Sequence, residues 1–448
     1  MDGQCAADGA PDGLAGRASA VSGNLPATGV RLREDGLGSG QSTEGIAEGR
    51  SEPTAAVKAD RVAVLDVLRG LAILGILLMN IQSFGRLSPE YVNPKALGDP
   101  PTVDWVIWLL NHIIADEKFI SILTMLFGAG ILLMARSSQD SPAVFERKFR
   151  RRMAWLFVFG MVHAVVLWPG DILAAYAICG LIAVRFRDRH AAELIAIGLS
   201  LFAAVMILWM LISAILIYGL PSDLRADLTA RFWQPTEDDI AEETERLTTG
   251  WTTAAGERAL NAIGVQAWML ASDRIWRMVG MMLIGMALLK IGFLSGDWGL
   301  RRYRLVIVLG LLIGIPVILA GLLFNQAVDW DFRYSLLLGR IANHWGSIAV
   351  SLAWVAVLVF LVKTDVLAYL WRPLAPVGRL AMSNYIGQSI ICASIFYGFG
   401  LGLFAQLNNL HLLGVVVGIW VVQVLLSAVW YRHVGQGPLE RLWRWLAR

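Results

Sequence analysis

Two residues of this chain, His163 and Asp171, have the types and the spacing of a general base and its orienting carboxylate. They stand on either side of a Trp-Pro-Gly turn at 168–170, and apolar segments flank both. If those segments form a helical hairpin, the chain runs up and back between the two residues and their side chains approach each other. A carboxylate beside an imidazole fixes its tautomer and raises its basicity, as proton abstraction requires. A buried histidine can equally be a satisfied core residue, so a structural role stays open.

Three polar residues share one face of an apolar segment in the first quarter of the chain. The run from Val62 to Phe84 contains Asp66, Arg69 and Asn80, and it is long enough to cross a bilayer, since about 20 apolar residues suffice. At about 100° per residue the three fall on one stripe, with Arg69 and Asn80 roughly 16 Å apart along the axis. Ionisable groups inside a membrane are costly unless they are paired or face water, so the stripe predicts one wall of a cavity. The alternatives are an Asp66–Arg69 ion pair near the helix end and an interfacial asparagine.

A second polar group follows a Gly-Arg pair at 378–379. Arg379 opens an apolar segment in which Asn384 and Gln388 are four residues apart, and therefore lie on one helix face. We expect these three side chains to line a cavity. Interhelical hydrogen bonding is the structural alternative for the two amides.

The remaining histidines give weaker signals. His112 falls in a short amphipathic stretch, 104–115, that we expect on the external membrane interface, and His344 is expected near the membrane surface. The six histidines lack the spacings of zinc ligands, so we predict no metal and no bound cofactor.

The composition is that of a membrane protein. Of 448 residues, 56% are hydrophobic and 16% are charged, whereas soluble proteins have about 25% charged residues. The net charge of +3 comes from basic residues beside the apolar segments, which indicates membrane lipids as partners and argues against nucleic acid. The three cysteines predict no disulfide framework.

Ten apolar runs predict an all-α polytopic membrane protein, a bundle of about ten transmembrane helices. The runs lie near residues 62–84, 117–135, 153–169, 171–186, 192–219, 276–294, 304–325, 342–362, 380–404 and 411–431. Basic clusters fall on alternate connections, so the positive-inside rule places both termini in the cytoplasm.

The domain organisation follows from these runs. Residues 1–57 have many small and charged residues and no aromatics, which predicts a disordered N-terminal tail. Residues 58–448 predict a single transmembrane helical domain, within which residues 220–275 form an acidic external loop.

Several separate motifs are similar to those of one bacterial family. They are L-D-x-x-R-G-x-A-x-x-G-I-x-x-x-N at 65–80, R-R-x-x-x-L-x-x-x-G-x-x-H-A at 151–164, W-P-G-D-I-L-x-x-Y-A at 168–177, G-R-x-A-x-S-N-Y-x-x-Q-S at 378–389 and G-P-L-E-x-L-W-R at 437–444. A further motif, F-x-x-L-F-G-x-G-I, matches at 123–131 except that Leu123 stands at its first Phe. Over residues 61–446 the chain thereby resembles the YeiB-like membrane proteins, also called DUF-418.

The resemblance implies a location in the bacterial cytoplasmic (inner) membrane. It also implies a distant similarity to transmembrane acyltransferases such as heparan-α-glucosaminide N-acetyltransferase, in which a cytosolic acyl-CoA donor and an acceptor on the far side meet within the membrane. On this scheme His163, oriented by Asp171, deprotonates the acceptor, while Arg69 and Arg379 attract the phosphates of the acyl-CoA.

The three amides have a role in the acyltransferase scheme, and two other functions are alternatives to it. Asn80, Asn384 or Gln388 would hydrogen-bond the developing oxyanion. A transporter for a small polar or anionic solute would use the same polar stripe as its pathway, with Asp66 or His163 carrying a coupling proton. A structural membrane component without turnover is the third alternative.

Overall fold

Helices make up all the regular structure of the described residues. The computed structural model describes residues 55–249 and 255–448, and in these two ranges no strand occurs. The long helices are α1 (Ala55–Gly85), α3 (Lys118–Ser137), α4 (Pro142–Val166), α6 (Ala191–Ala214), α11 (Leu300–Ala327), α13 (Leu338–Thr364) and α17 (Asn409–Val434). The shorter ones are η1 (Ser88–Tyr91), α2 (Thr102–Ile114), α5 (Leu173–Ala183), η2 (Val184–Phe186), η3 (Ile215–Gly219), α7 (Ser222–Phe232), α8 (Glu237–Thr248), α9 (Ala255–Ala271), α10 (Arg274–Lys290), α12 (Phe332–Ser335), α14 (Ala368–Trp371), α15 (Leu374–Arg379), α16 (Ala381–Phe396) and α18 (Pro438–Leu446).

Six segments of the described chain are long and apolar enough to cross a membrane. They are Ala63–Gly85, Thr102–Ser137, Ala191–Gly219, Leu300–Ala327, Phe332–Thr364 and Asn409–Val434. Each of the ten predicted runs coincides with a helix, but α5, α10 and α16 have only 11, 17 and 16 residues, and the first half of α4 is strongly basic. Length and hydropathy therefore support six crossings, and the other four helices are shorter or more charged.

One predicted run, 380–404, is wrong at its C-terminal end. Helix α16 ends at Phe396, and the glycine-rich residues that follow form turns. The backbone N–H of Gly398 donates to the carbonyl of Leu247 at 3.1 Å, and that of Leu401 donates to Ser394 at 2.8 Å. Gly402 has a φ of +66°, a conformation that suits glycine and is incompatible with a continuing helix. The chain leaves the helix because its backbone groups find partners elsewhere.

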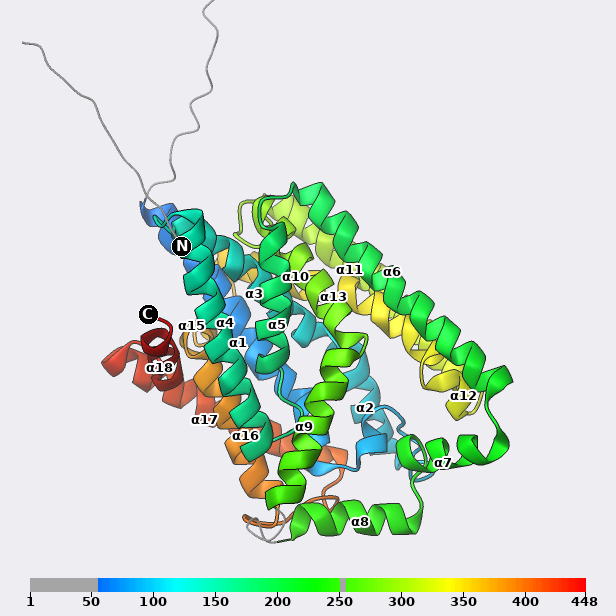
Figure 1. Cartoon of the computed structure of the whole chain (residues 1–448). Helices are drawn as coiled ribbons and strands as arrows, with labels where there is room; N and C mark the ends of the chain where they lie inside the picture. The colour runs from blue at the N-terminus through cyan, green and yellow to red at the C-terminus, as the bar shows by residue number, and fades with distance from the viewer. Residues whose placement is uncertain (1–54, 250–254) are drawn as a thin grey trace, which may run out of the picture. The chain divides into compact units, whose positions relative to one another are not determined.

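The structure describes one of the two segments that were predicted outside the apolar runs, the acidic segment 220–275, almost completely, and the N-terminal tail 1–57 only at its end. The tail lies outside the described residues up to 54, and its last three residues already belong to α1. The acidic segment 220–275 contains α7, α8 and α9, of which α7 and α8 lie at the end opposite the start of α1 (Figure 1). Thr236 caps α8 by accepting the N–H of Asp239 at 3.2 Å, which satisfies a donor that the first turn would leave free.

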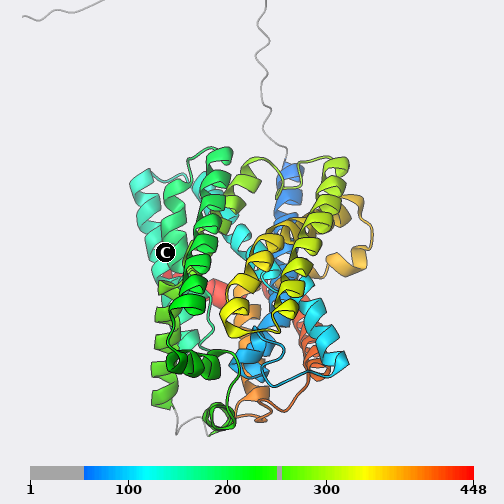
Figure 2. The same cartoon turned by 90° about the vertical axis from the view of Figure 1, so that its right-hand side faces the viewer.

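The core is formed by helices from distant parts of the sequence. Helix α1 packs against α3, α15 and α16, α10 packs against α3 and α6, and α11 runs along α13 (Figure 2). At the contact of α1 with α15, a Cβ added to Gly378 would lie 1.8 Å from the carbonyl oxygen of Asp66. Only glycine permits this approach, which sets Arg379 directly beside the polar end of α1.

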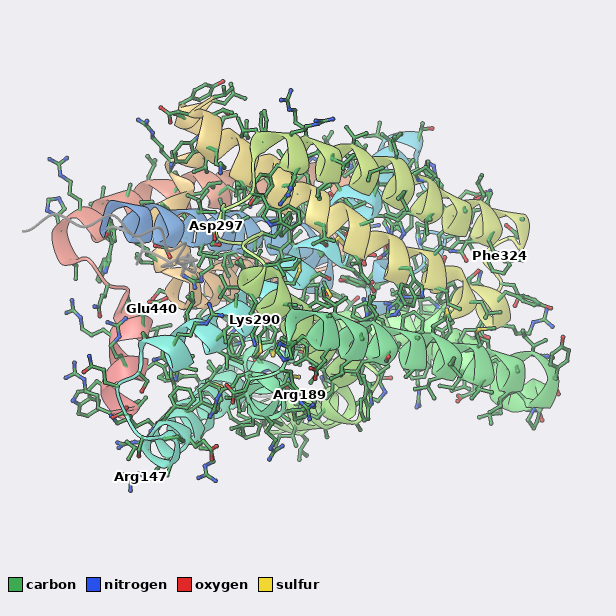
Figure 3. All side chains as sticks on the ribbon, turned by 90° about the horizontal axis from the view of Figure 1, so that it is seen from above. Arg147, Arg189, Lys290, Asp297, Phe324 and Glu440 are labelled. Carbon is green, nitrogen blue, oxygen red and sulfur yellow. The ribbon has the colours of Figure 1, made fainter. Side chains whose placement is uncertain are left out.

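Basic residues from separate connections gather at one end of the helices. Figure 3 looks onto this end, where Arg147, Arg189 and Lys290 come from the regions of α4, α6 and α10. The Lys290 ammonium donates to the carbonyl of Arg189. Segments that the sequence places on alternate connections are therefore neighbours in space.

Candidate functional site

His163 and Asp171 form a buried hydrogen-bonded pair at the turn between α4 and α5. Nδ1 of His163 lies 2.8 Å from Oδ1 of Asp171, and their side chains are 1% and 0% exposed. A carboxylate only accepts hydrogen bonds, so Nδ1 of the imidazole is the donor in this contact, and in the corresponding tautomer the lone pair is on Nε2. Nε2 is buried and has no hydrogen-bond partner among the described residues. The helical hairpin expected from the sequence thus brings the two side chains together; their chemical role stays a prediction.

The surroundings hold this pair in place. Oδ2 of Asp171 accepts the backbone N–H of Ala174, in the first turn of α5, at 2.8 Å. A Cβ at Gly160 would lie 2.6 Å from that same oxygen, so the missing side chain makes room for the carboxylate. The Tyr385 ring lies 5.2 Å from the imidazole, centroid to centroid. From α9, the Gln266 amide donates to the carbonyl of Asp171 at 3.0 Å, which ties α9 over the turn (Figure 1).

Asp66, Arg69 and Arg379 form a second polar group. Oδ1 of Asp66 accepts from Arg69 Nη1 and Oδ2 accepts from Arg379 Nε, both at 2.8 Å. The Arg379 guanidinium also donates to the Tyr431 hydroxyl and stacks over that ring at 4.5 Å. The ion pair expected from the spacing of Asp66 and Arg69 is therefore present, with a second arginine added from α15. Both arginines are about one-third exposed, at 30% and 34%.

The three predicted amides lie in different environments. Asn384 donates to the carbonyl of Val377 at 3.1 Å and to the Ser427 hydroxyl at 2.9 Å. Gln388 donates to the carbonyl of Ile73 at 3.0 Å and to Gln423 of α17 at 2.9 Å. These bonds join α16 to α1, α15 and α17, as the interhelical alternative requires.

Asn80 is half-buried and its side chain forms no hydrogen bond in the described structure. No hydrogen bond in the described ranges joins Asn80 or Asp66 to His163 or Asp171. The predicted residues that form hydrogen bonds therefore fall into three groups, which no hydrogen bond joins in the described ranges: the His163–Asp171 pair, the Asp66 group and the amides of α16.

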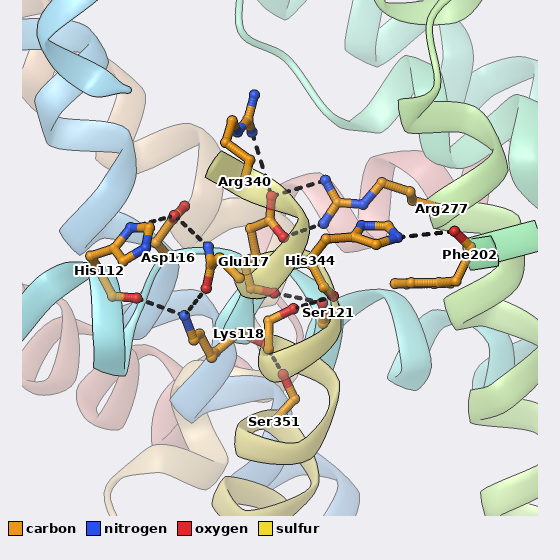
Figure 4. A network of polar contacts seen from close by, with 12 residues as sticks. His112, Asp116, Glu117, Lys118, Ser121, Phe202, Arg277, Arg340, His344 and Ser351 are labelled. Carbon is orange, nitrogen blue, oxygen red and sulfur yellow. Dashed lines mark hydrogen bonds and ion pairs between the residues drawn. The ribbon is translucent and has the colours of Figure 1, made fainter. Parts of the chain in front are cut away.

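A further buried cluster surrounds Glu117, and Figure 4 shows it. The Glu117 carboxylate is held in bidentate fashion by Arg277 of α10, with 2.9 Å to Nη1, and lies 3.5 Å from Arg340 of α13. Glu117 adopts a left-handed conformation with φ of +65°, which breaks the apolar segment between α2 and α3. His344 donates from Nε2 to the carbonyl of Phe202 at 3.2 Å, while its Nδ1 is buried and has no partner in the part of the chain that the structure describes.

The cluster continues through a buried lysine. Lys118 is 0% exposed, and its ammonium donates to the carbonyl of His112 and to Asn343 Oδ1, both at 2.6 Å. The Asn343 amide donates in turn to Asp116 at 2.8 Å, and Asp116 lies 3.1 Å from Nδ1 of His112. A fully buried lysine requires such partners because an isolated ammonium in an apolar medium is strongly disfavoured.

The charged members of this cluster were not predicted from the sequence. Its signal in the sequence is the run Asp116-Glu117-Lys118 at the start of an apolar segment, together with Arg277 and Arg340 near the starts of two others. Each of these residues alone resembles a residue at a helix end, and only the packing of α3, α10 and α13 shows that they face one another.

Several apolar helices with polar groups buried between them define a multi-pass helical membrane protein. Residues 288–448 match a family model described as "Protein of unknown function (DUF418)". The "Uncharacterized protein YeiB" of Escherichia coli (strain K12) is 33% identical over 390 residues, which cover 86% of this chain and 96% of that protein. The "Uncharacterized protein YxaH" of Bacillus subtilis (strain 168) is 28% identical over 403 residues, 86% of this chain and 94% of that protein. The chain belongs to the YeiB-like DUF418 family.

Proposed function

We propose that this protein is a transmembrane acyltransferase of the bacterial cytoplasmic membrane, with both termini in the cytoplasm and about ten crossings. It moves an acyl group from a cytosolic acyl-CoA to an acceptor in the envelope. The observation that supports this most directly is the buried His163–Asp171 pair, in which Nε2 of the imidazole has no hydrogen-bond partner within the described residues. A fixed tautomer with a free lone pair is the state that a general base needs before reaction.

The residues of the pair have distinct roles in this reaction. Nε2 of His163 takes the proton of the acceptor hydroxyl or amine as its oxygen or nitrogen bonds to the thioester carbon. The carbon–sulfur bond breaks, and the imidazolium returns the proton to the departing CoA thiolate. Asp171 stabilises the imidazolium through the 2.8 Å contact and keeps the ring oriented.

The other predicted residues bind the donor and the transition state. Arg69 and Arg379 carry two positive charges against the single charge of Asp66, so the group has a net charge of +1 for the phosphates of acyl-CoA. Asn384 and Gln388 already use their amide donors between helices, whereas the Asn80 amide is unused in the described structure. Asn80 is therefore the amide that we assign to the oxyanion, a contact that typically lowers a barrier by about 3 kcal/mol.

Transfer of radiolabel from acyl-CoA tests the proposal. Purified protein in nanodiscs is incubated with labelled acetyl-CoA and an envelope extract, and label in the acceptor fraction is counted. His163→Ala should reduce transfer by about 100-fold or more, while His411→Ala, at an exposed position of α17, should leave it unchanged. The thermal midpoint of each variant is measured to establish folding. The proposal fails if the wild-type protein transfers no label, or if the two variants are equally active.

A second candidate function, a proton-coupled transporter, is favoured by the cluster around Glu117 and Lys118. Ionisable residues buried in a candidate span are typical of proton and solute pathways. In proteoliposomes, an imposed pH gradient should drive accumulation of a small anionic solute, and Glu117→Gln should abolish it. A panel of solutes that shows no gradient-dependent uptake would eliminate this candidate.

A further inference from the structure

A cavity of about 440 Å³ lies between the C-terminal end of α3, the start of α4 and α18. Four basic side chains line it, Lys148, Arg152, Arg444 and Arg448, together with the rings of Phe145 and Phe149. No acidic side chain is among the residues that line it. A basic rim next to an aromatic wall suits a ligand that carries both negative charge and an apolar part.

Contacts between α4 and α18 build this cavity from two distant parts of the chain. The Trp443 indole N–H donates to the carbonyl of Arg152 at 2.9 Å, and the Arg152 guanidinium stacks over the Trp443 ring at 4.2 Å. Arg151 Nε donates to the carbonyl of Leu446 at 3.1 Å and so satisfies the end of α18. The cavity is therefore a built feature of the fold, with α18 as one of its walls.

The acidic residue of α18, Glu440, binds α16 and does not line the cavity. Glu440, labelled in Figure 3, accepts the backbone N–H groups of Met382 and Ser383 at 2.7 and 3.0 Å, which ties α18 to α16. Its carboxylate is thereby committed to the N-terminal turn of α16, where negative charge is favourable. It is not among the residues that line the cavity.

Of the four basic side chains that line the cavity, the three arginines form no ion pair among the described residues. Lys148 is paired with Asp140 at 2.8 Å. Nε of Arg152 is buried and has no hydrogen-bond partner in the described part of the chain. Arg444 and Arg448 form no ion pair within residues 55–249 and 255–448. Three guanidinium groups thus face one space, and each can donate to an anion.

We propose that this cavity binds the phosphate group of an amphiphilic anion, supplied by an anionic phospholipid or by an acyl-CoA. Guanidinium groups bind phosphate oxygens through paired N–H donors, and they do so more strongly than they bind neutral acceptors. The rings of Phe145 and Phe149 pack against the apolar part of the same ligand. This site is separate from the His163–Asp171 pair, and it holds whether or not the protein is an acyltransferase.

Ligand binding to the full chain in neutral detergent tests the proposal. Dioleoylphosphatidylglycerol, dioleoylphosphatidylcholine and palmitoyl-CoA are the probes, and native mass spectrometry gives their dissociation constants. The wild-type protein should bind the phosphatidylglycerol or the palmitoyl-CoA at least about tenfold more tightly than the zwitterionic lipid, the effect of one charged hydrogen bond. Competition between the two anions identifies the source of the phosphate. If phosphatidylglycerol binds more tightly than palmitoyl-CoA, the site is assigned to lipid. If palmitoyl-CoA binds more tightly and displaces the phosphatidylglycerol, the site is assigned to the nucleotide.

Variants locate the binding in the cavity. Arg152→Gln with Arg444→Gln should weaken the preferred anion about tenfold or more, and Arg441→Gln, on α18 but outside the cavity, should not. Because Arg152 packs on Trp443, Arg444→Gln with Arg448→Gln repeats the test without disturbing that contact. The proposal is overturned if the zwitterionic lipid binds as tightly as both anions, or if Arg441→Gln weakens binding as much as the cavity variants.

Discussion

Replacing Glu117 with Gln removes the only carboxylate that contacts both Arg277 and Arg340 in the described structure. The two side chains of the closer pair are 9% and 15% exposed, so water cannot compensate for the loss. Removing one partner of a buried ion pair typically costs about 3–5 kcal/mol. Gln keeps the length of the side chain and one acceptor oxygen, which puts the expected loss of unfolding free energy at about 3 kcal/mol.

Unfolding in mixed micelles, titrated with a denaturing detergent, measures this loss. The double variant Glu117→Gln with Arg277→Gln should be less destabilised than the sum of the single variants, with a coupling of about 2 kcal/mol. Glu193→Gln is the matched control, because Glu193 pairs with Arg189 at the surface, and it should change stability by less than about 0.5 kcal/mol. Additive effects, or a loss below about 1 kcal/mol in Glu117→Gln, would refute the view that the cluster is a tightly coupled buried group.

Two further substitutions test packing and hydrogen bonding by the same unfolding assay. Gly378→Ala sets a Cβ 1.8 Å from the carbonyl oxygen of Asp66 and should lower the free energy of unfolding by about 3 kcal/mol. Gly414→Ala, whose Cβ meets nothing within 4 Å, should leave stability unchanged. Equal stability of the two variants would contradict the close approach of α1 and α15. Gln388→Ala breaks two buried hydrogen bonds and should lower the free energy of unfolding by about 2 kcal/mol. Gln406→Ala, at an exposed position, should lower it by less than about 0.5 kcal/mol. If the Gln388→Ala variant is as stable as this control, water replaces the lost hydrogen bonds.

The helices were largely predictable, because apolar runs of this length have few other structures open to them in a membrane. Prediction from the sequence fails where a contact with a distant part of the chain determines the end of a helix. The apolar run extends to residue 404 in the sequence, but α16 ends at Phe396. The backbone N–H of Gly398 donates to the carbonyl of Leu247 and not to a carbonyl of α16. Likewise, the number of crossings depends on helices such as α5 and α16, which are shorter than a bilayer normally requires.

Some contacts between polar residues were likewise predictable from the sequence, and others were not. The contact between His163 and Asp171 follows from a hairpin closed within a few residues, so local geometry was enough to anticipate it. Arg379 reaches Asp66 across 313 positions of sequence, and no periodicity signals such a pair. The cluster of Glu117 was missed for this reason: the partners of Glu117 come from two separate helices, α10 and α13, and a single sequence contains no record of their packing.

The sequence distance between Glu117 and its partners has a consequence for how the protein is made. Arg277 follows it by 160 positions and Arg340 by 223. At a synthesis rate of about 5–20 residues per second, the first counter-charge emerges roughly 8–32 s after the carboxylate. During that interval the corner between α2 and α3 carries an acid and a lysine whose later partners do not yet exist. Insertion must therefore leave this corner at the water interface, and its burial becomes a late step of assembly, coupled to the arrival of α10 and α13.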